Sequence, residues 1–403
     1  MKILMLSCFF PYPPTKGGTQ VRTFNLIKHL SQQHQLTLLT QVGENVLDEQ
    51  IEQLREFVDK LVVFPKPPPA NEAGLLSKAK RLGSFLQQGT PPQVLSLYSP
   101  EMQSWVDEAV NRGEFAVLTC EHSYNEIYVR PEWHNKIRTV VNIHSSLSRS
   151  SQSDISDQHG EKKLKEQFNF PLVKRYEQMY CNKFTAVVVT TDLDKKQIKS
   201  LDSEAAITVI PNGVNLKQFP KRVTNQGGQR LLFVGAMDNN SDIDAVHFLC
   251  QEILPELRIR YPETTLEMVG SRPTTEVQAL GELPGVKVIS QVSSLVEYLH
   301  WATVCIVPVR LGVGIKNKTL EAMAAGVPVV ASDRGLEGLT VDGADVPLRA
   351  MRANSIDEYV YAIGRLFTEA KLREKLSENG RAMIEKEYTW ERAGTRYEQV
   401  LSG

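Results

Sequence analysis

The chain has 403 residues, of which 41% are hydrophobic and 23% are charged, a composition typical of a soluble globular protein with two or three domains. Its formal net charge of −1 argues against a general nucleic-acid-binding protein. The sequence has no apolar stretch near the roughly 18 residues that a membrane-spanning helix needs. Its five cysteines lie far apart, so we expect buried free thiols and a cytoplasmic protein.

The N-terminal segment MKILMLSCFFPYPP imitates a signal peptide, with one Lys before an apolar run. The run breaks at Pro11 and lacks a convincing small-residue cleavage site, so we interpret Lys2 to Cys8 as a buried parallel strand. A loop with Gly17 and Gly18 follows, and then an amphipathic helix from about Val21 to Ser31. This order of strand, glycine loop and helix begins a doubly wound α/β domain.

The glycine loop lies at the carboxyl end of the first strand, where open α/β sheets bind ligands. Arg22 would lie on the first turn of the following helix, facing the same edge. The alternative is a proline-rich turn followed by an ordinary surface arginine. The next strand candidates are Leu36–Gln41, Leu61–Phe64, Ala116–Cys120, Thr139–Ile143, Thr185–Thr190 and Ala206–Ile210.

Two of these strands end in polar tips that contain His122 and His144. An imidazole at this edge could act as an acid or base, or bind a sugar hydroxyl, because it both donates and accepts hydrogen bonds. Both could equally be surface loop histidines. The serine-rich segment from Ser145 to Gly160 predicts a mobile loop, followed by a long helix over Glu161–Lys183.

A second α/β series follows the polar segment VTNQGGQ, residues 223–229, which predicts a linker. Its expected strands are Leu231–Val234, Leu266–Val269, Val286–Ile289, Val304–Val307 and Val327–Ala331. We therefore expect domains over 1–222 and 230–375, with C-terminal helices over 376–403, the last of which could pack across the first domain. Two such domains imply a cleft lined by the carboxyl ends of both sheets.

One glycine loop and the helix that follows it, in the second series, contain several residues suited to binding a ligand. Gly312 and Gly314 would let a ligand approach the backbone, and a helix beginning near Lys318 would present unpaired N–H groups to phosphate. Lys316 and Lys318 could add positive charge, and Glu321 is placed to accept hydrogen bonds from sugar hydroxyls. This combination predicts a sugar-nucleotide site, although an ordinary connection with solvated lysines has the same pattern.

The chain resembles the family 4 glycosyltransferases (GT4) of the GT-B fold, which are retaining enzymes that use nucleotide-sugar donors. The resemblance runs through nearly the whole chain. It depends on Gly17–Gly18 with Arg22, on His144, and on three segments: VIPNGVNLKQF at Val209–Phe219, LLFVGAMD at Leu231–Asp238 and KTLEAMAAGVPVVAS at Lys318–Ser332. Within the family, the sequence is similar to bacterial sugar transferases of exopolysaccharide systems.

The resemblance implies roles for particular residues. Glu321 would hold the ribose hydroxyls, the Gly17–Gly18 loop would approach the diphosphate, and His144 would lie near the transferred sugar. The implied catalytic residues are His144, Lys318 and Glu321, and Arg22 and His122 are expected on the acceptor side. The implied donor-binding residues are Gly17, Gly18, Arg310, Gly312, Gly314, Lys316, Asn317, Thr319 and Glu321.

Two positions depart from the family pattern. Val313 stands where many members have a donor-binding glutamate, and Ala236 stands where many have a diphosphate-binding arginine. Positive charge at the diphosphate must then come from elsewhere. Lys316, Lys318 and Arg310 are the nearest candidates, and Lys16 is a further one.

We expect retaining transfer from a nucleotide-diphosphate sugar to a hydroxyl of a glycan or glycolipid. We see no cluster of metal ligands, so we expect no cofactor and no metal, with preorganised cations and helix N–H groups stabilising the leaving group. A glycolipid acceptor would favour peripheral contact with the inner face of the membrane. The alternatives are a sugar-nucleotide epimerase of the same fold and a catalytically silent partner subunit.

Overall fold

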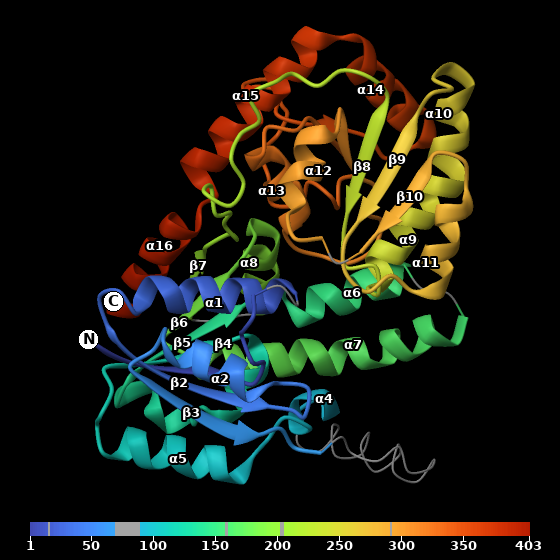
Figure 1. Cartoon of the computed structure of the whole chain (residues 1–403). Coiled ribbons are helices and arrows are strands. Elements are labelled where there is room, and N and C mark those ends of the chain that lie inside the picture. Colours follow the sequence, from blue (N-terminus) through green and yellow to red (C-terminus); the bar gives the residue numbers. More distant parts are fainter. Residues whose placement is uncertain (15–16, 69–88, 158–159, 202–204, 291) are drawn as a thin grey trace. The chain divides into compact units, whose positions relative to one another are not determined.

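The computed structural model describes residues 1–14, 17–68, 89–157, 160–201, 205–290 and 292–403 (Figure 1). The chain divides into two compact units. Unit 1 contains Met1–Pro211 together with Ala393–Gly403, and unit 2 contains Asn212–Arg392. Each unit has its own parallel sheet and its own hydrophobic core. The units are therefore described separately.

Within its described part, unit 1 has a seven-stranded parallel sheet in the order β3-β2-β1-β4-β5-β6-β7. The strand order reverses beside β1, and such a switch point is where doubly wound sheets bind ligands at their carboxyl edge. The strands are β1 Lys2–Ser7, β2 Gln35–Val42, β3 Lys60–Pro65, β4 Val117–Glu121, β5 Arg138–Ile143, β6 Ala186–Val189 and β7 Ala206–Val209.

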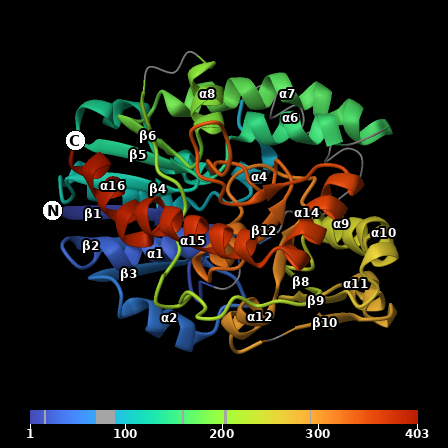
Figure 2. The same ribbon diagram turned by 90° about the horizontal axis from the view of Figure 1, so that it is seen from above.

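Helices and short helical turns connect these strands. They are α1 Gly18–Leu30, α2 Asp48–Arg55, α4 Pro92–Leu95, α5 Pro100–Asn111, η1 Ser123–Tyr128, η2 Pro131–Asn135, α6 Leu147–Asp157, α7 Gly160–Cys181, α8 Asp192–Lys199 and the C-terminal α16 Trp390–Ser402. Helices α6 and α7 run side by side (Figure 2).

Unit 2 repeats this winding in the residues described, with a six-stranded parallel sheet in the order β10-β9-β8-β11-β12-β13. Its strands are β8 Arg230–Val234, β9 Thr265–Val269, β10 Val286–Ile289, β11 Val304–Val307, β12 Val329–Ala331 and β13 Met351–Arg352. The switch point lies beside β8, so the loops after β8 and β11 meet at the ligand-binding edge.

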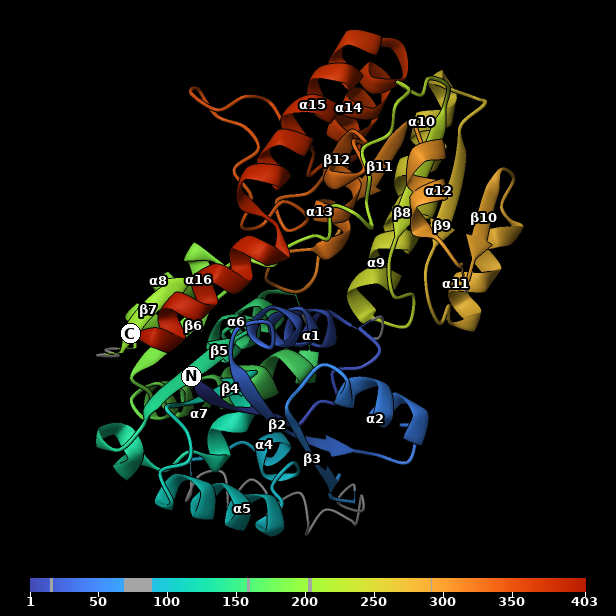
Figure 3. The same ribbon diagram turned by 60° about the vertical axis from the view of Figure 1, so that its left-hand side comes forward.

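The helical elements of unit 2 are α9 Asn240–Phe248, the π-turn η3 Leu249–Ile253, α10 Leu254–Arg260, α11 Thr275–Ala279, η4 Leu280–Glu282, α12 Leu295–Trp301, α13 Asn317–Ala324, α14 Ile356–Thr368 and α15 Ala370–Glu387. Helices α14 and α15 pack against each other (Figure 3). None of the helices described combines the length and the apolar character needed to cross a bilayer.

The predicted α/β class and two doubly wound domains are confirmed, and each predicted strand is present with bounds that differ by at most two residues. Two details differ. The units divide at Pro211–Asn212, before the expected linker at 223–229, because Val214 and Phe219 are buried in the core of unit 2. The C-terminal residues from Ala393 onward belong to unit 1.

The prediction of a mobile loop over Ser145–Gly160 was wrong, since most of this segment is helix α6. The start of this helix is capped by a buried carboxylate that is distant in sequence. The carboxylate of Glu177 accepts hydrogen bonds from the backbone N–H groups of Leu147 and Ser148 at 2.9 and 3.1 Å. These are donors that the start of a helix leaves unpaired, and a carboxylate there also interacts favourably with the helix dipole.

Candidate functional site

In unit 2, the loop between β11 and α13 carries the predicted glycines. Gly312 and Gly314 both have positive φ, at 78° and 87°, a conformation that glycine adopts without strain. The backbone N–H of Gly314 already donates to Oε1 of Glu337 at 2.6 Å. The loop is therefore braced by a carboxylate that the sequence analysis did not identify, and this N–H is not directed at a ligand.

Two cations lie on the carbonyl groups of this loop. The ammonium of Lys316 donates to the carbonyl oxygen of Gly314 at 3.0 Å, and the guanidinium of Arg334 donates to that of Gly312 at 3.2 Å. Lys316 was predicted and Arg334 was not. Arg334 follows β12, whose carboxyl end lies at the same edge of the sheet as that of β11. That adjacency could have been inferred from the strand order.

The other predicted cations of unit 2 are held by carboxylates of α9. The ammonium of Lys318 forms a short ion pair with Asp242 and lies over the ring of Phe233. Arg310 makes a two-point contact with Asp244 at 2.7 and 3.0 Å and stacks on Phe248. A donor phosphate would have to compete with these carboxylates. Arg310 is thus placed as a bracing residue rather than as a free cation.

Helix α13 begins at Asn317, directly after the glycine loop. The side chain of Asn317 accepts a hydrogen bond from Asn212 at 3.0 Å, and the hydroxyl of Thr319 is buried and donates to the carbonyl of Gly335 at 2.8 Å. Both predicted donor-binding side chains are thus engaged within the protein. The first-turn N–H groups of the helix remain the part that can meet a phosphate.

Glu321 lies one turn into the same helix. No hydrogen-bond partner of its carboxylate is found in the described part of the chain, although the carboxylate is largely enclosed. Burial raises its pKa to about 7, and the positive charge of Lys318 opposes this rise. An enclosed carboxylate without donors is a strong acceptor for hydroxyl groups that a ligand would bring.

In unit 1, the loop after β1 ends at Gly17, and helix α1 begins at Gly18. The carbonyl of Gly17 accepts the first helical hydrogen bond, from the N–H of Val21 at 3.0 Å. The first turn of α1 has no acidic residue. Its start at the carboxyl edge of the sheet agrees with the predicted position, and Lys16 lies outside the described residues.

Arg22 is not a surface residue. Its side chain is 1% exposed, and its guanidinium donates to Oδ1 of Asn142 through Nε at 3.2 Å and Nη2 at 3.0 Å. Asn142 in turn donates to Oε2 of the buried Glu121 at 2.8 Å. In this position Arg22 is hydrogen-bonded to the end of β5, and its expected place on the acceptor side stays a prediction.

The two predicted histidines meet at the ends of β4 and β5. Their ring centroids lie 5.3 Å apart, with Phe9 and Tyr124 packed on His122. His122 has a φ of 82°, unusual for a residue with a side chain, and its Nδ1 accepts from the N–H of Tyr124 at 3.3 Å. Burial and the neighbouring His144 lower the pKa of His122 to about 3.

His144 has a different environment. Its side chain is 11% exposed, and neither ring nitrogen has a hydrogen-bond partner among the residues described. Its Nε2 lies 3.8 Å from Oε2 of Glu121. Burial, followed by the charge of Arg22, lowers the pKa of His144 well below its ordinary value. Both ring nitrogens are buried as well as unpartnered among the described residues, and a neutral imidazole has one donor and one acceptor nitrogen for a hydroxyl that reaches it.

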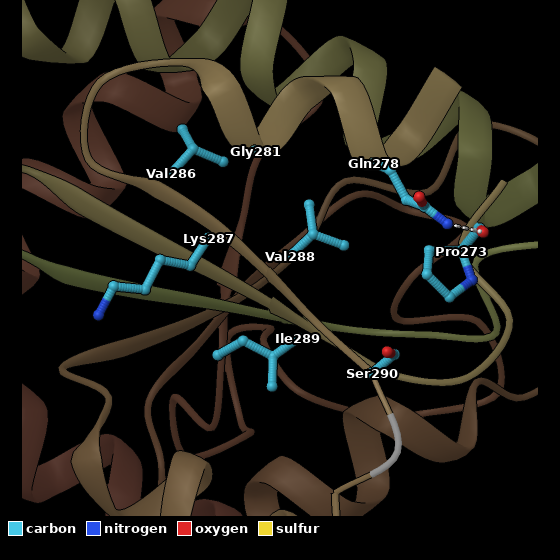
Figure 4. Close-up of a pocket in the computed structure, with 8 residues that line it drawn as sticks. All are labelled: Pro273, Gln278, Gly281, Val286, Lys287, Val288, Ile289 and Ser290. Atoms are coloured by element: carbon cyan, nitrogen blue, oxygen red, sulfur yellow. Dashed lines mark hydrogen bonds between the residues drawn. The ribbon is translucent and has the colours of Figure 1, made fainter. Parts of the chain in front are cut away.

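A separate hollow of about 620 Å³ lies beside the edge strand β10 of unit 2 (Figure 4). None of the predicted site residues lines it. Its lining residues are Pro273, Gln278, Gly281, Val286, Lys287, Val288, Ile289 and Ser290. The described ranges also contain no group of three or more His, Cys, Asp or Glu side chains arranged to hold a metal ion.

The sheets and strand-end loops define a two-domain protein of the GT-B class, and the comparisons with known proteins agree. The family model "Glycosyltransferase Family 4" matches residues 16–218, about half of the chain, and the model "Glycosyl transferases group 1" matches residues 228–369. The chain therefore belongs to the family 4 glycosyltransferases, which confirms the resemblance inferred from its motifs.

Among curated proteins, the chain is similar to the GDP-mannose-dependent alpha-(1-6)-phosphatidylinositol monomannoside mannosyltransferase of Mycolicibacterium smegmatis. The two are 32% identical over 172 residues, or 37% of this chain and 42% of the relative. The match thus spans less than half the length of that relative.

Among solved structures, the sucrose-phosphate synthase of Thermosynechococcus elongatus has a TM-score of 0.71 at 18% identity, covering 99% of this chain and 98% of the other. HepE of Anabaena, solved in complex with UDP, has a TM-score of 0.66 at 15% identity, covering 100% of both chains. These similarities show the fold.

Proposed function

We propose that the chain transfers a sugar from a nucleotide-diphosphate donor to a hydroxyl of a glycan or glycolipid, with retention of the anomeric configuration, in surface polysaccharide synthesis. The observation that carries the donor assignment is Glu321. Its enclosed carboxylate has no hydrogen-bond donor in the described part of the chain, and it follows a glycine loop and a helix start by one turn. Two ribose hydroxyls would supply the missing donors.

The diphosphate would lie against the start of α13. Lys316 and Arg334, which both contact carbonyl groups of the glycine loop, would neutralise its charge. They would take the role of the arginine that many family members have where this chain has Ala236. Lys318 would contribute if the donor draws it from Asp242. Fixed cations and N–H groups stabilise the charge that develops on the leaving nucleoside diphosphate without reorganising, and we propose that no metal is needed.

The proposal of retention rests on the resemblance to retaining family 4 enzymes. Glu121, at a strand end of unit 1, is buried and hydrogen-bonded, so it is a poor candidate for the nucleophile of a two-carboxylate route such as that of glycosidases. We propose that the acceptor attacks on the face from which the phosphate departs, and that this phosphate takes the acceptor's proton. His144 would bind a hydroxyl of the transferred sugar.

The test is a thermal-shift panel of UDP-, GDP- and ADP-sugars with a chelator present. The panel covers the GDP-mannose and UDP named for the relatives. A ligand that binds only the folded protein raises the melting temperature, by an amount equivalent to about 2.7 kcal/mol at a hundredfold excess over Kd. One positive donor should then give a transferase product of retained configuration by NMR. A folded protein that responds to no donor would favour the silent partner subunit instead.

A further inference from the structure

The C-terminal helix places a tyrosine among the strand-end residues of unit 1. Tyr397 of α16 is completely buried. Its hydroxyl donates to Oε1 of Glu121 at 2.6 Å and also contacts the hydroxyl of Thr119. Thr119 and Glu121 are two residues apart on β4, so both point to the same face of the sheet. Helix α16 is thereby hydrogen-bonded to β4, the strand that ends at Glu121, one residue before His122.

Contacts on either side of Tyr397 set its position along the sheet. A Cβ at Gly394 would lie 2.2 Å from the ring of His29, so the helix approaches α1 as closely as glycine allows. One helical turn after Gly394, Oε1 of Glu398 lies 2.9 Å from Nε2 of His34. Arg138 donates to the carbonyl of Val400 at 2.8 Å. The depth and register of Tyr397 are therefore defined.

With Oε1 held by Tyr397, the Glu121 carboxylate cannot rotate freely. Its other oxygen, Oε2, accepts from Asn142 and lies 3.8 Å from Nε2 of His144. Asn142 is itself oriented by the guanidinium of Arg22. Oε2 thus lies near an imidazole whose two nitrogens have no hydrogen-bond partner in the described chain.

We propose that Tyr397 is a positioning residue for His144: by holding Oε1 of Glu121, it keeps Oε2 facing Nε2 of the imidazole. A carboxylate at that nitrogen favours the tautomer with the proton on Nε2. Nδ1 is then left as the acceptor nitrogen of the ring, and because it is buried in this structure, a hydroxyl of the bound sugar reaches it only if neighbouring side chains move. This inference depends on the proposed function only in the identity of that ligand.

The charged and titratable groups around this pair come from several elements. Arg22 of α1, His122 after β4 and Tyr397 of α16 all face Glu121 or His144. Burial raises the pKa of Glu121, and the hydrogen bond from Tyr397 is the largest influence that opposes the rise. Removing the tyrosine hydroxyl therefore raises that pKa further, and Glu121 becomes neutral at a higher pH.

The test compares Tyr397→Phe with Tyr176→Phe in the full chain. Tyr176 is an equally buried tyrosine of unit 1, and its hydroxyl donates to a different carboxylate, Glu126, also at 2.6 Å. Tyr397→Phe should lower kcat about tenfold, as for one lost hydrogen bond to a charged group. The donor KM should stay within about twofold, and the acid limb of the kcat profile should move to higher pH. Tyr176→Phe should change neither.

Imidazole ¹⁵N NMR gives a readout that does not require activity. Signals of His144 are assigned by their loss in His144→Gln. Tyr397→Phe should shift the Nε2 and Nδ1 resonances of His144 toward a mixture of tautomers, and Tyr176→Phe should leave them in place. If the wild type transfers no sugar from any donor, the proposed function fails but these spectra still decide the inference.

Unchanged His144 resonances in Tyr397→Phe would overturn the inference, as would equal loss of kcat in both variants. If Tyr397→Phe does not fold, Glu121→Gln is used, which removes the carboxylate charge and keeps the side-chain volume. The same shift of the His144 resonances is expected. Its absence would overturn the inference in that variant too.

Discussion

Two enclosed carboxylates lie at the carboxyl edges of the two sheets, one in each unit, and they differ in what surrounds them. Glu121 in unit 1 accepts hydrogen bonds from Tyr397 and Asn142. Glu321 in unit 2 has no hydrogen-bond donor among the residues that the structure describes. Burial raises the pKa of both. The protein itself donates hydrogen bonds to the first carboxylate, whereas the second can still accept them.

The two carboxylates differ in how far hydrogen bonds offset the free energy that their burial costs. Burying a carboxylate is unfavourable unless hydrogen bonds replace the lost water, and in unit 1 they do. In unit 2 no described residue donates to the carboxylate, so the unfavourable term remains. A protein that keeps such a group gives up some stability for binding, as active sites commonly do. Variants of the two glutamates should therefore behave in opposite ways.

The largest effect is expected for Glu121→Ala. It would leave the buried guanidinium of Arg22 and the hydroxyl of Tyr397 without their carboxylate, which costs about 3–5 kcal/mol for a broken buried charge cluster. Chemical denaturation should show this loss of unfolding free energy at pH 7. The matched Glu321→Ala should lose far less. Equal losses in both variants would mean that the two carboxylates are not distinguished in this way.

Glu321→Gln should stabilise the protein at alkaline pH. The folded pKa of about 7 lies above the ordinary value of 4.5, so the folded state binds the extra proton between these values and wild-type stability falls as pH rises through them. The gap corresponds to about 3 kcal/mol. The variant should match the wild type near pH 4.5 and exceed it by about that amount at pH 8. A constant difference from pH 4.5 to pH 8 would contradict the raised pKa.

Donor affinity should depend on the same residue. Replacing Glu321 by Ala removes the acceptor for two ribose hydroxyls, and hydrogen bonds to a charged group contribute about 1.5–3 kcal/mol each. We therefore expect the Kd of the nucleotide-sugar donor to rise about 100-fold or more, measured by calorimetry at pH 8. Glu267→Gln, on β9 and paired with the exposed Lys287, is the control and should leave Kd unchanged. Unchanged affinity in Glu321→Ala would mean that the donor site is misplaced.

The comparison also shows what could be predicted from the sequence. Both sheets followed from apolar runs bounded by glycine and proline, and Glu321 followed from its place one turn after a glycine loop. Glu121 could not be singled out, because its partner Tyr397 is 276 residues away and looks like any apolar residue of an amphipathic helix. The burial of Arg22 could not be predicted for the same reason, since its partner Asn142 is distant in sequence.

The serine-rich segment of α6 was misassigned because its helix start is capped by Glu177, which follows 30 residues after Leu147. Likewise, Glu337 takes the N–H of Gly314, which the local pattern had left for phosphate. Patterns within one strand or helix predict elements and first-turn chemistry. They do not predict which distant side chain has already occupied a donor or acceptor, and this decides what a site can still bind.

The pH dependence of donor binding sharpens the contrast further. Hydroxyl donors favour the ionised form of Glu321, so binding below its pKa of about 7 must release a proton. The donor Kd should then rise about tenfold for each pH unit below 7 and level off above it. Calorimetry at pH 6 in buffers of different ionisation enthalpy should detect release of about one proton.

The strand-end histidines cannot produce this effect in the same window. Burial lowers the pKa of His122 to about 3 and that of His144 well below its ordinary value, so both stay neutral from pH 6 to pH 8. Glu321→Gln should therefore abolish the proton release and flatten the pH dependence, while Glu121→Gln should preserve both. If Glu121→Gln flattened the profile instead, the carboxylate that responds to the donor would be the one in unit 1.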